Sequence, residues 1–445
     1  MMPSTQTPIA QPAPQTFTGA NKHLHGDTRI EPGEIAVGVV IGRASEYFDF
    51  FVYAIASVLV FPAVFFPFED ALEGTLWSFV VFSFAFIARP IGTAISMMIQ
   101  AHFNRQVKLT IALFLLGIST VCIAFLPGYA SLGFTSIVLL SVLRIGQGLA
   151  LGGSWDGLPS LLALNAPEGK RGWYAMLGQL GAPVGFMLAS GLFAYLYASL
   201  PAEDFLSWGW RYTFYVAFAI NVVALFARLR LVSTDEYAHL LEERELAPTS
   251  LTELTRTQGY NIVIGAFAAL ASYALFHLVT VFPLSWIKLF TDHSITEFLG
   301  LQVFGAFLAA GGVVVSGLIA DHIGRRKTLG SLAFAIGVFA LFAPFLLDGG
   351  RIGQDIFLLL GFLLLGLSYG QAAGAVTANF DPKYRYAGAA LTSDFAWLIG
   401  AAFAPLVALG LSARFGLAFI SLYLLSGAIC TLIALRINRA LEVGE

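Results

Sequence analysis

The chain has 445 residues, of which 58% are hydrophobic and 11% are charged, and its mean hydropathy is +0.79. An average soluble domain is about 25% charged, so a soluble core could not hide this much apolar surface and the chain must lie in lipid. The formal net charge of −3 indicates no nucleic-acid partner, and the two cysteines, Cys122 and Cys430, lie inside apolar runs where they pack and cannot build a metal cluster.

Residues 1–33 are rich in proline, glutamine and threonine and contain no apolar core. This composition is neither that of a signal peptide nor that of a fold. We expect a disordered cytoplasmic tail here, and we expect the first apolar run itself to direct the chain to the membrane.

Twelve apolar segments follow, each long enough to cross a bilayer, which needs about 20 mostly apolar residues. Because backbone polar groups in lipid must be satisfied within their own segment, all twelve are expected to be helices. The expected spans are residues 34–61, 75–100, 107–127, 134–164, 172–199, 208–230, 260–287, 296–320, 328–347, 354–378, 387–412 and 416–437. The sequence thus predicts an all-α membrane protein with twelve transmembrane helices.

The longest polar stretch between spans, residues 231–259, divides the spans into six plus six. We predict an N-terminal six-helix bundle at 34–230, a cytoplasmic linker at 231–259, a C-terminal six-helix bundle at 260–437 and a short tail at 438–445. An internal repeat supports the division, since MMIQAHFNRQV at 97–107 and GLIADHIGRRK at 317–327 both follow the second span of a half. The two bundles are therefore expected to be pseudo-symmetric products of a duplication.

Lysine and arginine are unevenly divided between alternate loops, and this bias sets the orientation. The loops on the same side as both termini hold most of these residues, whereas the other loops hold only Arg211, Lys288, Arg351 and Arg414. Because basic loops stay in the cytoplasm, we expect a multi-pass protein of the cell (inner or plasma) membrane with both termini cytoplasmic.

The first span carries Arg43, Glu46 and Asp49, and each charge would cost about 2.5–3.5 kcal/mol at the centre of a lone inserted helix. Partners must relieve that cost. At about 1.5 Å per residue, Asp49 lies level with Arg144 of the fourth span and Arg43 lies level with Asp156, each within about one turn. We predict two ion pairs between these helices. Whether Asp49–Arg144 takes part in transport or is a static structural pair stays open.

Glu46 is the acid that this pairing leaves without a base. A carboxyl group kept away from water holds a proton more readily, so Glu46 is the predicted proton carrier, with a permanently protonated or hydrogen-bonded structural acid as the alternative. Arg89 and Asp394 are further pathway candidates, although Arg89 can equally form a structural pair and Asp394 can equally be solvated or cap a helix. His277 is expected to be a packed hydrogen-bonding group. The other candidates are glutamines expected to form hydrogen bonds in a cavity: Gln147, Gln179 and Gln371.

Two motifs stand out: the loop Gly317-x-x-x-Asp321-His322-x-Gly324-Arg325-Arg326-Lys327, and Arg144-x-x-Gln147-Gly148 in the fourth span. The first resembles the signature loop of the major facilitator superfamily, and the second resembles that superfamily's second motif. Further stretches resemble one branch, the metabolite:H+ symporters, which include osmolyte, α-ketoglutarate, citrate and shikimate carriers. These stretches are Glu46-Tyr47-Phe48-Asp49-Phe50, Ala166-Pro167 to Arg171-Gly172, and Trp208-Gly209-Trp210-Arg211.

The resemblance implies a cytoplasmic gate in which Asp321 caps a neighbouring helix in one state and releases it in the other, with a plain basic anchor as the alternative. The gate residues are Gly317, Asp321, Gly324, Arg325, Arg326 and Arg105. The chain departs from the family pattern in its first-half loop, where Met97, Ala101 and Asn104 replace Gly, Asp and Gly. Ser154 stands where the family usually has Glu, and Asp156 stands where it usually has a small residue.

Together these features predict a secondary active transporter in which two six-helix bundles rock around a central site. The resemblance implies proton symport of a small polar metabolite. An organic acid is preferred because Arg144 and Arg43 can counter a carboxylate, and a zwitterionic osmolyte comes second. No ATP-binding motif, nucleophile elbow or metal-ligand cluster is visible in the sequence, so neither an enzyme nor a cofactor, metal or ATP is expected. The alternative is a transport-inactive membrane sensor that keeps the carrier fold, which Ala101 and Ser154 favour.

Overall fold

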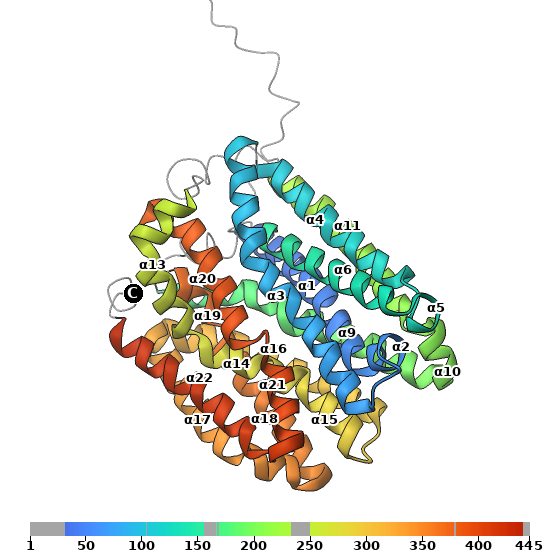
Figure 1. The fold of residues 1–445 in the computed structure, drawn as a ribbon. Helices are drawn as coiled ribbons and strands as arrows, with labels where there is room; N and C mark the ends of the chain where they lie inside the picture. Colours follow the sequence, from blue (N-terminus) through green and yellow to red (C-terminus); the bar gives the residue numbers. More distant parts are fainter. Residues whose placement is uncertain are drawn as a thin grey trace, which may run out of the picture.

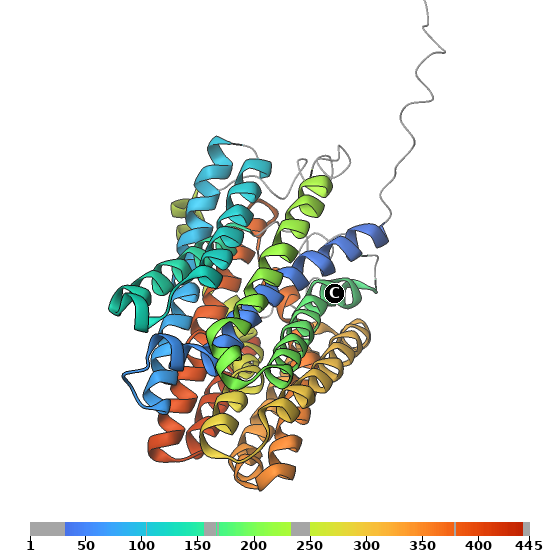
Figure 2. The same cartoon turned by 90° about the vertical axis from the view of Figure 1, so that its right-hand side faces the viewer.

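The computed structural model describes residues 32–103, 105–154, 166, 169–232, 250–377 and 380–438, and these residues are almost entirely helical, with no strand among them. The first half of the chain forms one group of helices and the second half forms another beside it (Figure 1). The helices run alongside one another from one end of the molecule to the other (Figure 2). The predicted all-α fold is confirmed.

Six spans come from the first half. They are α1 (Pro32–Leu59), α3 (Ala71–His102), α4 (Arg105–Phe125), α6 (Phe134–Gly153), α8 (Arg171–Leu177) joined by the 3-10 turn Gly178–Leu180 to α9 (Gly181–Ser199), and α11 (Arg211–Val232). The connecting segments contain α2 (Phe61–Phe65), α5 (Tyr129–Leu132), α10 (Ala202–Asp204) and the π-helical turn Phe205–Gly209. Asp70 starts α3 by accepting a hydrogen bond from the backbone N–H of Glu73 across 2.8 Å.

The second half repeats the pattern with more interruptions. Its elements are α13 (Leu251–Ala268), α14 (Leu270–Thr280), α15 (Phe282–Phe290), α16 (Ile295–Ile323), α17 (Arg325–Asp348), α18 (Gly350–Tyr369), α19 (Ala372–Thr377), the 3-10 turn Pro382–Tyr384, α20 (Arg385–Gly400), α21 (Ala404–Phe415) and α22 (Ala418–Ile437). Pro283 lies in the first turn of α15, where a missing N–H is tolerated, and the chain breaks just before it at Val281.

Eleven helical segments of the described residues are long and apolar enough to cross a membrane. Helix α1 is 28 residues long, carries Arg43, Glu46 and Asp49 in its middle, and completes the twelve predicted spans. Helix α11 ends at Val232 and α13 begins at Leu251, so both ends of the predicted linker at 231–259 are helical. Most of that linker and of both predicted tails (residues 1–31, 233–249 and 439–445) lies outside the described residues.

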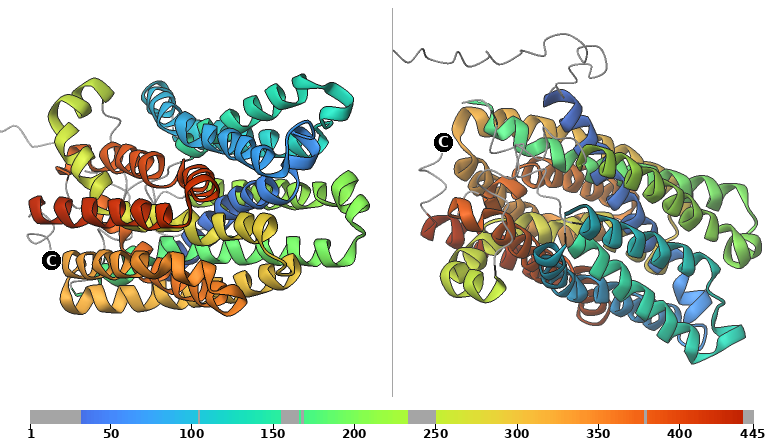
Figure 3. Two further views of the ribbon diagram at one scale, coloured as in Figure 1. Left: turned by 60° about the horizontal axis from the view of Figure 1, so that its bottom comes forward. Right: turned by 90° about the horizontal axis from the view of Figure 1, so that it is seen from above.

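Equivalent helices pack on one another in the two halves. Helix α3 packs on α6 as α16 packs on α18, α4 packs on α11 as α17 packs on α22, and α11 lies against α1 as α22 lies against α14. The halves meet along α9 with α16 and along α3 with α20 and α21, and Figure 3 shows this arrangement from two further sides. One apolar core runs through both halves. The repeated packing is what a duplicated bundle predicts.

The closest helix contacts depend on glycine. A Cβ atom at Gly148 in α6 would lie 2.3 Å from the carbonyl oxygen of Ala85 in α3, and one at Gly366 in α18 would lie 2.1 Å from that of Ala309 in α16. Small residues permit such close backbone approach in membrane bundles. Gly148 belongs to the second family-like motif, so this motif fixes α6 against α3 and with it the position of Arg144, one turn earlier.

Candidate functional site

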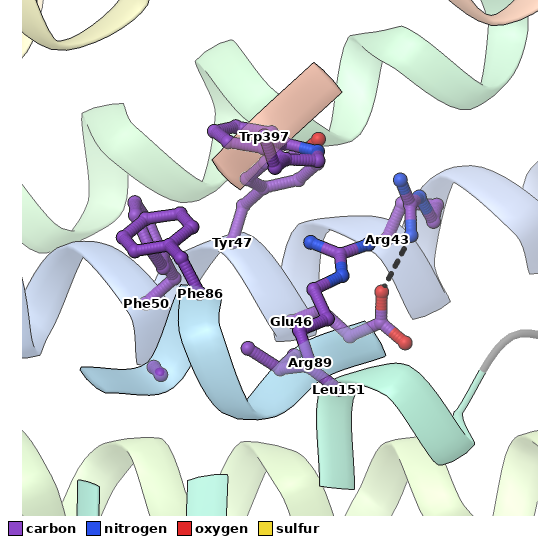
Figure 4. Close-up of a pocket in the computed structure, with 9 residues that line it drawn as sticks. Arg43, Glu46, Tyr47, Phe50, Phe86, Arg89, Leu151 and Trp397 are labelled. Atoms are coloured by element: carbon purple, nitrogen blue, oxygen red, sulfur yellow. Dashed lines mark hydrogen bonds and ion pairs between the residues drawn. The ribbon is translucent and has the colours of Figure 1, made fainter. Parts of the chain in front are cut away.

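A small cavity lies between the two halves near the middle of α1. Its volume is about 30 Å³, which is room for a few water molecules at about 10–15 Å³ each. The first half supplies Arg43, Glu46, Tyr47, Phe50, Ala85, Phe86, Arg89 and Leu151, and the second half supplies Trp397. In Figure 4 the charged side chains lie on one side of the cavity and the rings of Phe50 and Phe86 on the other. The halves have closed on this region.

Glu46 and Arg43 form an ion pair within α1. Arg43 Nη1 lies 2.8 Å from Glu46 Oε2, and the hydroxyl of Ser154 donates to Glu46 Oε1 across 3.0 Å. The dashed line in Figure 4 marks the ion pair. The prediction that Glu46 lacks a base is therefore wrong, because residues three apart on a helix face each other. Asp156, the predicted partner of Arg43, lies outside the described residues.

Asp49 is almost fully buried and is held by neutral side chains from three other helices. Thr120 Oγ1 donates to its Oδ2 across 2.6 Å, Gln147 Nε2 donates to its Oδ1 across 3.1 Å, and the amide of Asn221 donates to Oδ2. The predicted direct ion pair with Arg144 is wrong. Arg144 Nη1 instead donates to Gln147 Oε1 across 3.0 Å, so the amide of Gln147 lies between the two charges. The depth match was correct, but Gln147 occupies the space that an ion pair would need.

Arg144 is surrounded by aromatic rings. Its Cζ lies 3.9 Å from the ring centroid of Tyr53 and 4.8 Å from that of Phe82, and its Nε donates to the Phe82 carbonyl across 3.2 Å. Cations over aromatic faces at such distances are stabilised by the ring quadrupole. The guanidinium is therefore held without a direct carboxylate partner.

A second ion pair crosses from one half to the other. Arg89 Nε in α3 lies 2.7 Å from Asp394 Oδ1 in α20, and Thr93 also donates to Asp394. Asp394 is only 2% exposed, so the solvated alternative for this residue is wrong. Among the described residues, three carboxylates are buried in the bundle: Glu46 and Asp394 each have an arginine partner, and Asp49 has none.

The signature loop, residues 317–327, joins the two halves at one end of the molecule. We call this end the loop end. Asp321 in α16 accepts hydrogen bonds from the backbone N–H groups of Gly172 (2.6 Å) and Trp173 (3.1 Å) at the start of α8. Gln371 donates to the Gly172 carbonyl across 3.2 Å. Asp321 thus caps the neighbouring helix, as the resemblance implies, and its charge suits the positive end of the helix dipole.

The remaining signature-loop residues place and support this cap. Gly317 lies against α8, and Gly324 ends α16 with a φ of 87°, which favours glycine. Arg325 donates to the Gly374 carbonyl (3.3 Å), and Arg326 donates to the Leu435 carbonyl (2.8 Å). The side chain of Arg105 lies outside the described residues.

Comparison with known proteins agrees with this geometry. A family model described as Major Facilitator Superfamily matches residues 39–405. The chain belongs to the Major Facilitator Superfamily. The "Inner membrane metabolite transport protein YhjE" of Escherichia coli K12 is 38% identical over 90% of this chain and 93% of its own length. The chain is thus a multi-pass membrane transporter of metabolites and not an enzyme.

More distant relatives have named substrates. The "Shikimate transporter" of Escherichia coli K12 is 28% identical over 88% of this chain and 91% of its own length. The "Proline/betaine transporter" of Salmonella typhimurium LT2 is 26% identical over 84% and 77%. The solved structure of the E. coli proton:xylose symporter XylE, bound to 6-bromo-6-deoxy-D-glucose, has a TM-score of 0.68 over 90% of this chain and 94% of that chain. At 19% identity this likeness shows the fold.

Near the first-half loop of this transporter, where the family's acid is missing, a different contact joins the two halves. Ala101 is exposed, and nearby Lys108 Nζ in α4 donates to the hydroxyl of Tyr386 in α20 across 2.6 Å. Lys108 also lies 5.2 Å from the Tyr386 ring centroid. Two contacts therefore join the halves at the loop end: the Asp321 cap on α8, and the contact between Lys108 and Tyr386.

Several polar residues of the transporter were missed in the sequence. These are Thr120, Asn221 and Thr93, which complete the contacts of Asp49 and Asp394. Tyr369, a residue that the sequence did suggest as a hydrogen-bonding group of the cavity, makes a hydroxyl contact with Tyr47 across the two halves. Asn221 carried a usable signal, because an amide in an apolar span is expected to form a hydrogen bond with a neighbouring helix. Gln179 lies buried in the turn before α9 with its Oε1 unpaired.

Proposed function

We propose that this transporter carries a small organic acid together with a proton across the cell membrane by alternating access. Two bundles, residues 34–230 and 260–437, would rock around the site between them. The loop end and both termini would face the cytoplasm, which the positive-inside rule supports. The small volume of the central cavity and the fastened loop end support a closed state within such a cycle.

The balance of buried positive and negative charges in the middle of the bundle is the main support for the proposal. In the described middle of the bundle, three arginines (Arg43, Arg89 and Arg144) match three carboxylates (Glu46, Asp49 and Asp394). A substrate carboxylate would add one uncompensated buried charge, and such charges are costly. Uptake of one proton by a resident carboxylate restores the balance, so an organic anion and a proton enter at less cost together than separately.

Asp49 is the carboxylate that best fits the role of proton site. Protonating Glu46 or Asp394 would break an existing ion pair, Arg43–Glu46 in the first case and Arg89–Asp394 in the second. Asp49 accepts hydrogen bonds from neutral groups, so its protonation leaves no arginine without an ion pair. Asp49 therefore replaces Glu46 as the proposed proton carrier.

A zwitterionic osmolyte is the second candidate, and the rings between the halves favour it. Tyr47, Phe276, Tyr273, Tyr369 and Trp397 gather with ring centroids 4.9 to 6.3 Å apart, and Tyr47 and Trp397 also line the cavity. Aromatic cages bind quaternary ammonium groups through cation–π attraction. The likeness to a proline/betaine transporter points the same way.

The test begins with thermal-shift screening of the purified protein against organic acids, betaines and amino acids. Ligands that stabilise the protein are then measured for uptake into proteoliposomes with an imposed pH gradient, with and without a proton uncoupler. We expect gradient-driven accumulation of an organic acid that the uncoupler abolishes. Binding without exchange of labelled ligand would contradict transport and favour the sensor alternative, whereas uptake insensitive to the uncoupler would contradict proton coupling.

A further inference from the structure

Three fully buried polar groups without hydrogen-bond partners gather around one aromatic ring. They are Tyr53 Oη in α1, Arg144 Nη2 in α6 and His277 Nε2 in α14. The ring is Phe82: the Arg144 guanidinium carbon lies 4.8 Å from its centroid, the His277 ring 5.3 Å and the Tyr53 ring 6.2 Å. None of these residues is more than 1% exposed. Buried polar groups are normally hydrogen-bonded, so three exceptions in one place call for a ligand.

The chemistry of the three groups limits what that ligand is. Both hydrogens on Arg144 Nη2 are donors and guanidinium has no acceptor, so the ligand must supply an acceptor oxygen or nitrogen. The tyrosine hydroxyl and a histidine N–H can donate to the same acceptor. Aromatic rings surround the histidine, with centroids 5.3 to 6.1 Å from that of the imidazole: Phe50, Phe82, Phe86 and Trp397. The part of the ligand beyond its acceptor would therefore contact apolar ring surfaces. A carboxylate on a compact body that offers an apolar face to these rings meets both conditions.

We propose that Tyr53, Arg144 and His277 form the subsite that binds the carboxylate of the transported metabolite, an inference that rests on the proposed function. Tyr53 and Arg144 belong to the first half and His277 to the second. A ligand bound by all three therefore holds the two halves together. Movement of the halves apart removes His277 from the other two groups and weakens the hold on the ligand.

The subsite is also linked to the proposed proton site. Arg144 uses Nη1 for Gln147, which in turn donates to Asp49, and it keeps Nη2 for the ligand. The carboxylate and the proton are therefore bound at opposite ends of one hydrogen-bonded chain, Asp49–Gln147–Arg144. The cavity lined by Phe50, Phe86 and Trp397 lies beside the same rings that contact His277, but at about 30 Å³ it is too small for the ligand's body in this closed state. The two halves must therefore separate around these rings for the ligand to enter.

Calorimetric titration of the full chain in lipid nanodiscs tests the subsite with sodium shikimate and glycine betaine. Methyl shikimate and choline, which lack the carboxylate, are the matched ligands. Tyr53→Phe removes only the hydroxyl, and His277→Phe keeps an aromatic ring, somewhat larger than imidazole, without the ring nitrogens. The matched control is Tyr423→Phe, at a tyrosine whose hydroxyl donates to the Gly400 carbonyl elsewhere.

We expect at least one carboxylate to bind the unmodified protein at least about tenfold more tightly than its matched ligand. Tyr53→Phe and His277→Phe should each weaken that carboxylate about tenfold, the range of one hydrogen bond to a charged group. The Tyr423→Phe variant should bind as the unmodified protein does. The subsite would be overturned if the carboxylate and its matched ligand bound equally well, if both test variants bound the carboxylate as tightly as the unmodified protein does, or if neither carboxylate bound.

The experiments can contradict the subsite and the proposed proton symport independently of each other. Binding that depends on Tyr53 and His277 without any pH-driven uptake would support the subsite and contradict proton symport. The opposite result, pH-driven uptake that both variants leave unchanged, would overturn the subsite and leave the proposed function standing.

Discussion

Gln147 donates a hydrogen bond from its amide nitrogen to Asp49 Oδ1 across 3.1 Å. The same side chain accepts a hydrogen bond from Arg144 through its amide oxygen, across 3.0 Å. A single amide thus connects a buried carboxylate to a buried guanidinium. Protonation of Asp49 makes it a weaker acceptor for the Gln147 amide, whose oxygen accepts from Arg144.

Replacing Gln147 with Leu should separate proton binding from substrate binding. Leucine has a similar volume but can neither donate to Asp49 nor accept from Arg144. Hydrogen bonds to charged groups contribute about 1.5–3 kcal/mol, so we expect at least about tenfold weaker gradient-driven uptake in proteoliposomes, with exchange of labelled substrate less affected. Gln354→Leu, at a buried glutamine that donates to the Leu347 carbonyl, is the control. Accumulation ratios equal to those of the control would refute the link.

The ion pair between Arg89 and Asp394 should show strong coupling between its two members. Asp394→Asn alone leaves a buried arginine charge uncompensated, and breaking a buried pair in this way costs about 3–5 kcal/mol. The double variant Arg89→Gln with Asp394→Asn removes both charges and should lose less stability than the sum of the single changes. Thermal unfolding of the four proteins in detergent measures the coupling. Strictly additive losses would mean that the two side chains do not interact.

Asp321→Ala should open the loop end. The change removes both hydrogen bonds that the carboxylate accepts from the first turn of α8, and each contributes about 1.5–3 kcal/mol to the closed state. Spin labels at the exposed positions Lys170 and Lys327 report the distance across this end by electron paramagnetic resonance. We expect a longer, broader distance distribution than in the unmodified protein.

The control for that measurement is Asp348→Ala, at an exposed acid on the other end of α17. It removes the same charge without touching the latch and should leave the distances unchanged. If both variants give the distribution of the unmodified protein, Asp321 does not hold the loop end closed.

The sequence predicted the spans well, because lipid forces each apolar run to satisfy its own backbone as a helix. It also placed Asp49 level with Arg144, since helical rise fixes depth. Depth says nothing about rotation or about what lies between, so Gln147 was not foreseen there. The Arg43–Glu46 pair could have been found, because residues three apart on a helix are neighbours.

Contacts between the halves were beyond sequence reasoning. Arg89 and Asp394 lie about 300 positions apart in the chain, and nothing in a single sequence gives the register of one bundle against the other. The contact of Lys108 with Tyr386 was hidden for the same reason. The missing acid at Ala101 was visible, but what replaces it depends on how α4 meets α20.

Uptake by Asp49→Asn proteoliposomes tests the central claim, that Asp49 carries the proton. The ligand is an organic acid found in the thermal-shift screen, and the measured quantity is its accumulation ratio under an imposed pH gradient, beside exchange without a gradient. Asparagine fills the same volume and cannot ionise, so the variant should exchange labelled ligand but fail to accumulate it. Accumulation by the variant to the level of the unmodified protein would contradict the claim.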